Sequence, residues 1–203
     1  YAGNRQIDII SEITSVMLDS YLAGTPIDSL SLEQLRKARR AKENRLFKLS
    51  NLIYNEEGTT IAFQELLNKP ERPILRLIKN DKIQFVYERF LEYMLAVQYD
   101  KMLEPNKVPF IPAEIYVNAL RTAAVNELFI SSLRNLIIID FLRTHNTQVI
   151  VELIYRYGDN FRILSLVSDV LNILVQENYG FILENRACPL NKINKRRILK
   201  YII

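Results

Sequence analysis

The chain has 203 residues, of which 49% are hydrophobic and 25% are charged, and its formal net charge is +4. Such a composition is typical of a globular protein that buries one large core or two small ones. No apolar run approaches the roughly 20 residues that cross a bilayer, so we expect no membrane contact. The single cysteine, Cys188, excludes an internal disulfide framework and predicts a reducing, cytoplasmic location. Because the chain starts at Tyr1 without a methionine, we expect it to be part of a longer protein.

The first predicted helix covers residues 5–22 and ends at Gly24. Its apolar residues at helical spacing are Ile7, Ile10, Ile13, Met17, Leu18 and Tyr21. A second helix is expected after Ser31, with Gln34 completing a capping box and with a break near residues 40–44.

After a predicted loop at residues 55–58 and a short helix at 61–67, the hydrophobic period changes within residues 74–99. Short apolar runs on either side of Asn80-Asp81 predict a β-hairpin over residues 74–86. From Tyr87 the period becomes helical. The polar residues expected to face away from the apolar stripe of this helix are Glu88, Arg89, Glu92 and Gln98.

The sequence at this change of hydrophobic period is Phe85-Val-Tyr-Glu-Arg-Phe-Leu-Glu-Tyr-Met-Leu-Ala96. It resembles the end of the winged-helix segment that follows the ATPase core in STAND-type P-loop NTPases, the NACHT-like signalling ATPases. The resemblance covers about residues 61–104. It implies a winged-helix unit, an ATPase domain upstream in the same chain as a partner, and a role in signalling or bacterial defence.

The chain departs from that family in two respects. It contains no Gly-x-x-x-x-Gly-Lys-Ser/Thr motif, so the resemblance implies that the nucleotide-binding core precedes residue 1 and that this segment holds no cofactor. Many STAND ATPases also place a winged-helix histidine against the nucleotide phosphate. The only histidine, His145, lies beyond the predicted winged helix, and we expect it to be an exposed loop residue.

Three prolines within residues 103–112 predict a domain boundary, with a winged-helix-like domain at 1–104 and a helical domain at 105–203. The second domain is expected to form an α-solenoid-like array of the HEAT or armadillo kind, although no clear repeat is present. Its predicted helices cover residues 112–121, 123–144, 147–157, 160–177, 179–185 and 191–201. The predicted fold class is therefore mainly α with one hairpin.

The candidate inter-domain junction consists of Tyr87, Glu88, Arg89, Phe90 and Tyr93. The large aromatic rings suit a half-buried seam between domains. For the charged residues, the preferred interpretation is a solvated helix start, and the alternative is a docking cluster for an ATPase domain. We hypothesise that this helix is a stiff lever, and that replacing Phe90 and Tyr93 by alanine destabilises the protein if both are buried.

Two basic clusters are candidate contacts for nucleic acid or an acidic partner. The first comprises Arg36, Arg39 and Arg40, to which Lys79 and Lys82 of the hairpin would add. The second comprises Lys195, Arg196 and Arg197. In both cases a solvated charged face is the preferred interpretation, and nucleic-acid binding is the less favoured one.

No carboxylate pair, catalytic triad or metal-ligand cluster stands out in the sequence, and one histidine supplies little acid–base chemistry. We therefore predict that this segment is not an enzyme, although the full-length protein would be an ATPase if the resemblance holds. The favoured function is a regulatory segment acting through inter-domain and protein–protein contacts. A winged-helix nucleic-acid-binding regulator and a plain helical scaffold are the alternatives.

Overall fold

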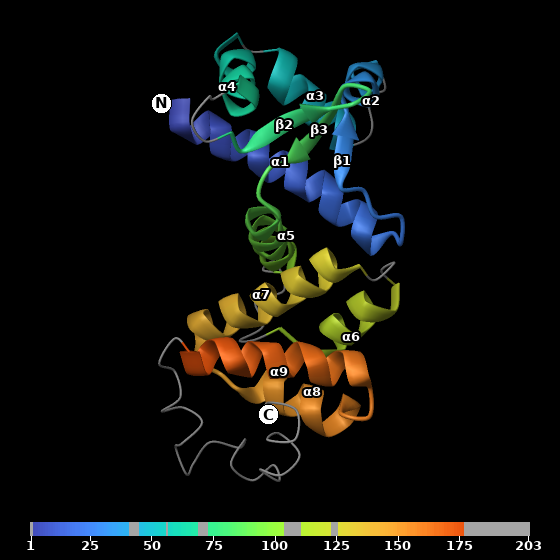
Figure 1. The fold of residues 1–203 in the computed structure, drawn as a ribbon, viewed down its shortest axis with the longest axis vertical. Helices are drawn as coiled ribbons and strands as arrows, with labels where there is room; N and C mark the ends of the chain where they lie inside the picture. The colour runs from blue at the N-terminus through green and yellow to red at the C-terminus, as the bar shows by residue number, and fades with distance from the viewer. Residues whose placement is uncertain are drawn as a thin grey trace. The chain divides into compact units, whose positions relative to one another are not determined.

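The computed structural model describes residues 2–40, 45–55, 57–68, 73–103, 111–122 and 126–176. The chain divides into two units, residues 1–98 and 99–203, and each is described by itself (Figure 1). The division falls inside helix α5 (Glu88–Leu103), whereas the proline pattern placed it between residues 104 and 105. As predicted, helices predominate, and a small antiparallel sheet accompanies them.

Unit 1 combines helices with a three-stranded sheet. The elements before α5 are α1 (Ala2–Leu22), β1 (Ser29–Ser31), α2 (Leu32–Ala38), α3 (Arg45–Tyr54), α4 (Glu57–Asn68), β2 (Leu75–Ile78) and β3 (Lys82–Phe85). The strands lie in the order β1-β3-β2, and both neighbouring pairs are antiparallel. The predicted hairpin is thus confirmed. Strand β1 was not predicted, because three residues are too few to show an alternating pattern.

The hairpin reverses at Asn80 and Asp81, whose φ angles are 65° and 52°. Among residues other than glycine, Asn and Asp adopt this left-handed region most readily. The N–H of Val86 donates to the carbonyl of Ile74 at 2.9 Å, which extends the ladder past the ends of the strands. The local sequence therefore accounts for the position of the turn.

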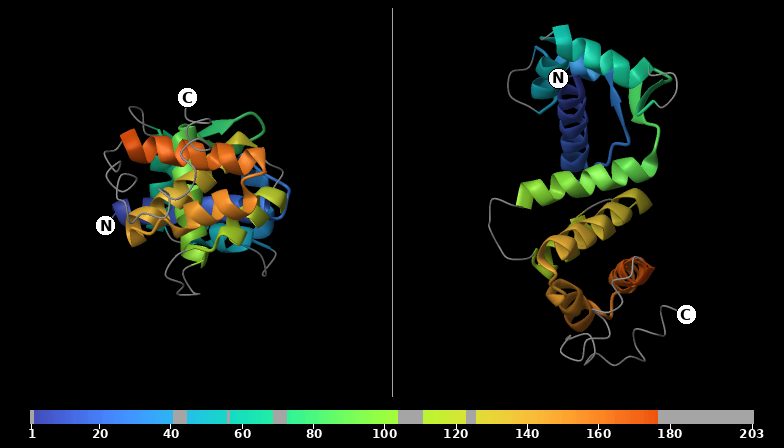
Figure 2. Two further views of the ribbon diagram at one scale, coloured as in Figure 1. Left: turned by 90° about the horizontal axis from the view of Figure 1, so that it is seen from below. Right: turned by 90° about the vertical axis from the view of Figure 1, so that its left-hand side faces the viewer.

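Helix α1 supplies the centre of the core of unit 1. Ile9, Ile13, Met17 and Tyr21 recur every four residues, and each is 0% exposed. Helices α3 and α4 pack against this helix (Figure 2). Ile7, however, is 61% exposed, so its place in the predicted apolar stripe was wrong. Two residues turn a helix by about 200°, so Ile7 faces away when Ile9 faces the core.

The helix boundaries in unit 1 follow local capping. Ser31 caps α2, and its hydroxyl accepts a hydrogen bond from the N–H of Gln34 at 3.4 Å, as predicted. Helix α4 begins at Glu57, within the stretch that was predicted as a loop. Gly58 lowers helix propensity and caused the error. The start of α4 is held instead by Thr60, whose hydroxyl donates to the carbonyl of Ile53 in α3 at 2.7 Å.

Unit 2 contains the end of α5 and then α6 (Ala113–Thr122), α7 (Glu127–Thr144), α8 (Gln148–Tyr157) and α9 (Phe161–Gln176). Helix α9 packs against both α7 and α8, and α6 packs against α8 (Figure 2). These helices confirm the predicted segments, except that α7 starts later, where Asn126 accepts from the N–H of Phe129 at 2.9 Å. The last two predicted helices lie outside the described residues. Within the described ranges, no helix has the length and apolar composition needed to cross a membrane.

Candidate interaction surfaces

The predicted junction begins where the hairpin leads into α5. The ring centroids of Phe85 and Phe90 lie 6.0 Å apart, and Phe85 is buried. Leu91 and Leu95 on the same helix are buried as well. Phe90, which is half-buried, therefore packs against Phe85 within unit 1.

The remaining junction residues are more exposed. Tyr87 and Tyr93 are each 50% exposed, and the side chains of Glu88 and Arg89 are also exposed. Arg89 and Tyr93 are four positions apart on α5, so they lie on one face of the helix. We call these three exposed residues, Tyr87 just before α5 and Arg89 and Tyr93 on it, the junction surface.

Two polar residues of α5 were expected to face away from the apolar stripe, and the structure corrects this. Glu92 and Gln98 are 9% and 8% exposed. The side-chain amide of Gln98 donates to the hydroxyl of Ser11 in α1 at 2.7 Å. This hydrogen bond offsets the cost of burying the amide. It joins residues 87 positions apart, so the helical period alone could not reveal it.

The first basic cluster lies on α2 and the turn that follows it. Lys37 forms an ion pair with Glu33 at 2.6 Å, and its hydrogen bond and positive charge lower the pKa of that carboxyl group. Arg39 donates to the side-chain oxygen of Asn55 at 3.2 Å, and its guanidinium carbon lies 5.8 Å from the centre of the Tyr54 ring.

Arg36 and Arg40 are exposed and have no ion-pair partner among the described residues. Lys79 and Lys82 of the hairpin are exposed too. The hairpin turn lies against the start of α2, because the N–H of Leu32 donates to the carbonyl of Asp81 at 2.9 Å. We call Arg36, Arg40, Lys79 and Lys82 the cationic surface.

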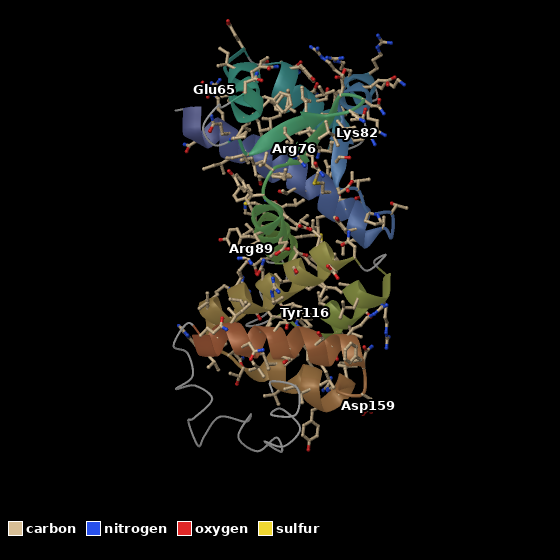
Figure 3. The ribbon with its side chains drawn as sticks, viewed as in Figure 1. Glu65, Arg76, Lys82, Arg89, Tyr116 and Asp159 are labelled. Atoms are coloured by element: carbon tan, nitrogen blue, oxygen red, sulfur yellow. The ribbon has the colours of Figure 1, made fainter. Side chains whose placement is uncertain are left out.

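Helix α4 carries the opposite charge. Glu57 and Glu65 are exposed on it, and Glu65 accepts a hydrogen bond from the side chain of Gln6 at 2.7 Å. Figure 3 shows Glu65 and Lys82 on opposite sides of unit 1. The exposed carboxylates of α4 and the cationic surface therefore lie apart on unit 1.

Unit 2 contains a charge network that sequence reasoning missed. The guanidinium of Arg143 donates to both carboxylate oxygens of Asp100 at 2.8 and 3.0 Å, and to Asp140 at 2.7 Å. The side chain of Asp140 is 0% exposed, and its second oxygen accepts from the N–H of Ile111 at 3.1 Å. The network thus joins the end of α5, the segment just before α6, and α7. The one available signal was that Asp140 interrupts an apolar run.

Two tyrosines are buried in unit 2. Burial raises the pKa of Tyr99 to about 12. It also raises the pKa of Tyr116 well above the ordinary value, and the negative charges of Asp140 and Asp100 add to this effect. Tyr116 is labelled in Figure 3. Its hydroxyl has no hydrogen-bond partner among the described residues.

His145 ends α7 in a left-handed conformation with φ of 51°, and its N–H donates to the carbonyl of Phe141 at 2.7 Å. Its side chain is exposed, as predicted. Sequence reasoning missed the exposure of Tyr155 and Phe161, which are 81% and 74% exposed. The remaining candidates, Cys188 and the second basic cluster of Lys195, Arg196 and Arg197, lie outside the described residues.

The described residues include no group of three or more histidine, cysteine, aspartate or glutamate side chains placed to hold a metal ion. No protein-family model, curated protein or solved structure matches this chain.

Proposed function

We propose that the chain is a regulatory, non-catalytic segment of a larger cytoplasmic STAND-type signalling or defence ATPase. In this proposal, unit 1 is a winged helix, unit 2 is an α-solenoid-like array, and the partners are an upstream ATPase domain and other proteins. The carrying observation is the junction surface, which exposes two tyrosines and an arginine immediately after the hairpin.

The winged-helix assignment is supported by the order of elements in unit 1. Three helices follow β1, and a hairpin completes a sheet whose first strand pairs with the third. A helical unit ending in such a hairpin is the arrangement that the resemblance of residues 85–96 implies. The solenoid assignment has weaker support, namely successive helices with short connections that pack on one another.

The junction surface has the composition of a protein-binding site. Tyrosine and arginine are enriched among residues that dominate interface energies, because they combine large apolar area with hydrogen-bonding groups. Tyr87 and Tyr93 leave half of their surface open. An upstream ATPase domain would bury that surface, and α5 would carry its movement into unit 2 as a lever.

The nucleic-acid alternative has support from the cationic surface, but α4 counts against it. In a helix-turn-helix protein the second helix enters the major groove. In unit 1, the helix in that place is α4, the last helix before the hairpin. It exposes Glu57 and Glu65, and their carboxylates would repel the phosphates of a duplex. Protein binding is therefore the better interpretation of unit 1.

The test is a binding titration between this chain and the protein region encoded immediately upstream of it, expressed separately. We expect a one-to-one complex by analytical ultracentrifugation, and we expect the Tyr87→Ser/Tyr93→Ser variant to lose it. Because both side chains are half-exposed, the variant should remain folded. Tyr155→Ser, at an exposed tyrosine of unit 2, is the matched control and should bind normally.

An upstream region without a Walker A motif would refute the STAND assignment. A complex that forms equally well with the Tyr87→Ser/Tyr93→Ser variant would refute the role of the junction surface. If no complex forms at all, the plain-scaffold alternative becomes the better account.

A further inference from the structure

We propose that the cationic surface of unit 1 binds an extended acidic segment of a partner protein. This inference rests on the proposed function in one respect only, namely that unit 1 works through protein contacts. It assigns a second binding site on unit 1, separate from the junction surface, and a chemical class of partner for it.

The backbone makes α2 and the hairpin turn one continuous surface. Ser31 both caps α2 and pairs with Lys82 across the sheet. The hydrogen bond from Leu32 to Asp81 holds the first turn of α2 against the hairpin turn. Lys82 and Lys79 are thereby brought beside the helix that carries Arg36.

The charges of this surface are available for a ligand. Lys37 is neutralised by Glu33, and Arg39 is engaged by Asn55 and Tyr54. Two exposed carboxylates lie on the same elements as these four cations, namely Asp81 at the hairpin turn and Glu33, which is paired with Lys37. This leaves a local excess of positive charge in a unit whose carboxylates on α4 lie on its other side (Figure 3).

The spacing of the arginines fits an extended peptide. The N–H of Arg40 donates to the carbonyl of Lys37 at 3.0 Å, so Arg40 continues the last turn of α2. Four residues of helix rise about 6 Å. Alternate side chains of an extended chain repeat at about 6.6 to 6.8 Å on one face. Arg36 and Arg40 can therefore meet successive carboxylates of a segment in which every second residue is acidic.

Nucleic acids fit this surface less well. Single strands bind through aromatic residues that stack on the bases, whereas the cationic surface contains none and the nearby Tyr54 is covered by Arg39. An acidic peptide needs only the surface itself.

The test is fluorescence anisotropy with a labelled peptide of alternating glutamate and serine, and with single-stranded and duplex DNA of equal charge, at physiological salt. We expect the peptide to bind most tightly. The Arg36→Gln/Arg40→Gln/Lys82→Gln variant should bind the peptide about ten-fold more weakly, because each lost cation reduces electrostatic attraction. The matched control, Lys101→Gln/Arg121→Gln/Arg162→Gln, removes three exposed cations from unit 2 and should change affinity less than about two-fold.

Equal weakening by both triple variants would overturn the proposal, because the binding would then reflect net charge alone. Tighter binding of either DNA than of the peptide, lost in the first variant, would overturn it in favour of nucleic acid. Absence of peptide binding would overturn it outright. The Tyr87→Ser/Tyr93→Ser variant should bind the peptide normally. A wrong assignment of the cationic surface can therefore be distinguished from a wrong assignment of the junction surface.

Discussion

The two units use charged residues in different ways. In unit 1 the ion pairs Lys37–Glu33 and Arg45–Asp19 lie on the surface, with every side chain at least 41% exposed. Unit 2 has an exposed pair too, Arg156–Glu114, but it also has Arg143, which joins one carboxylate that is 19% exposed and one that is 0% exposed. Exposed pairs contribute little to stability, whereas a buried carboxylate without its partner is costly. We therefore expect the charged residues of the cationic surface in unit 1 to contribute mainly to binding. The Arg143 network in unit 2 should contribute mainly to stability.

The largest expected effect comes from Arg143→Met in unit 2. Asp140 would remain buried, and among the described residues its side chain would keep only the N–H of Ile111 as a hydrogen-bond donor. Breaking a buried pair costs about 3 to 5 kcal/mol, and we expect about 3 kcal/mol because Arg143 itself is partly exposed. Urea unfolding followed by circular dichroism measures it.

The double variant Asp140→Asn/Arg143→Met is the control for that measurement. It removes the stranded charge, so it should recover part of the lost stability. If the single variant unfolds at the same urea concentration as the wild type, the network is not structural and the contrast between the units fails.

A smaller effect is expected at the turn between α8 and α9. A Cβ atom at Gly158 would collide with the backbone carbonyl oxygen of Ile154. Because the obstacle is backbone, Gly158→Ala should cost about 2 kcal/mol, within the range for overpacking.

In unit 1, Gly24 has φ of 76°, and Gly24→Ala should cost about 1 kcal/mol through left-handed strain. Thermal melts of the two variants should rank in that order, and the reverse order would contradict the steric argument.

The turns and helix caps could be predicted because they depend on neighbouring residues. Asn80 and Asp81 mark the hairpin, and Ser31 marks the start of α2. The start of α4 was misplaced because Gly58 is a poor helix former, and the bond from Thr60 to α3 is visible only in the folded chain.

The candidate surfaces were only partly predictable. The cationic residues were identified by their charge, but only the structure places Lys82 beside α2. The network around Asp140 joins residues 100, 111 and 143, which no local pattern relates. Half-burial was the expectation for Tyr93, but helical periodicity does not say which neighbours cover an aromatic ring.

Alkaline pH should destabilise unit 2 through Tyr99. Its pKa is raised to about 12 in the folded protein, against about 10 in an unfolded chain. The folded state therefore keeps its proton while the unfolded state loses it, and this share of stability is complete below pH 10 and lost as the pH rises toward 12. Each pH unit in that window should remove up to about 1.4 kcal/mol.

Tyr99→Phe should reduce this slope in urea titrations between pH 10 and pH 12. Equal slopes for the wild type and Tyr99→Phe would show that other groups, such as Tyr116, dominate the alkaline response.

The smallest effect is expected at the exposed pair of unit 1. Lys37 and Glu33 are 74% and 70% exposed, so solvent and salt screen their attraction, and holding two long side chains in place costs entropy. Lys37→Ala should leave the urea midpoint within experimental error at physiological salt. At low salt, Glu33 without Lys37 should repel an acidic peptide and weaken its binding. This loss of affinity should be smaller than the loss caused by removing Arg36, because Lys37→Ala leaves all four residues of the cationic surface in place. A clear loss of stability in Lys37→Ala would mean that charge also has a structural role in unit 1, and the division between the two units would not hold.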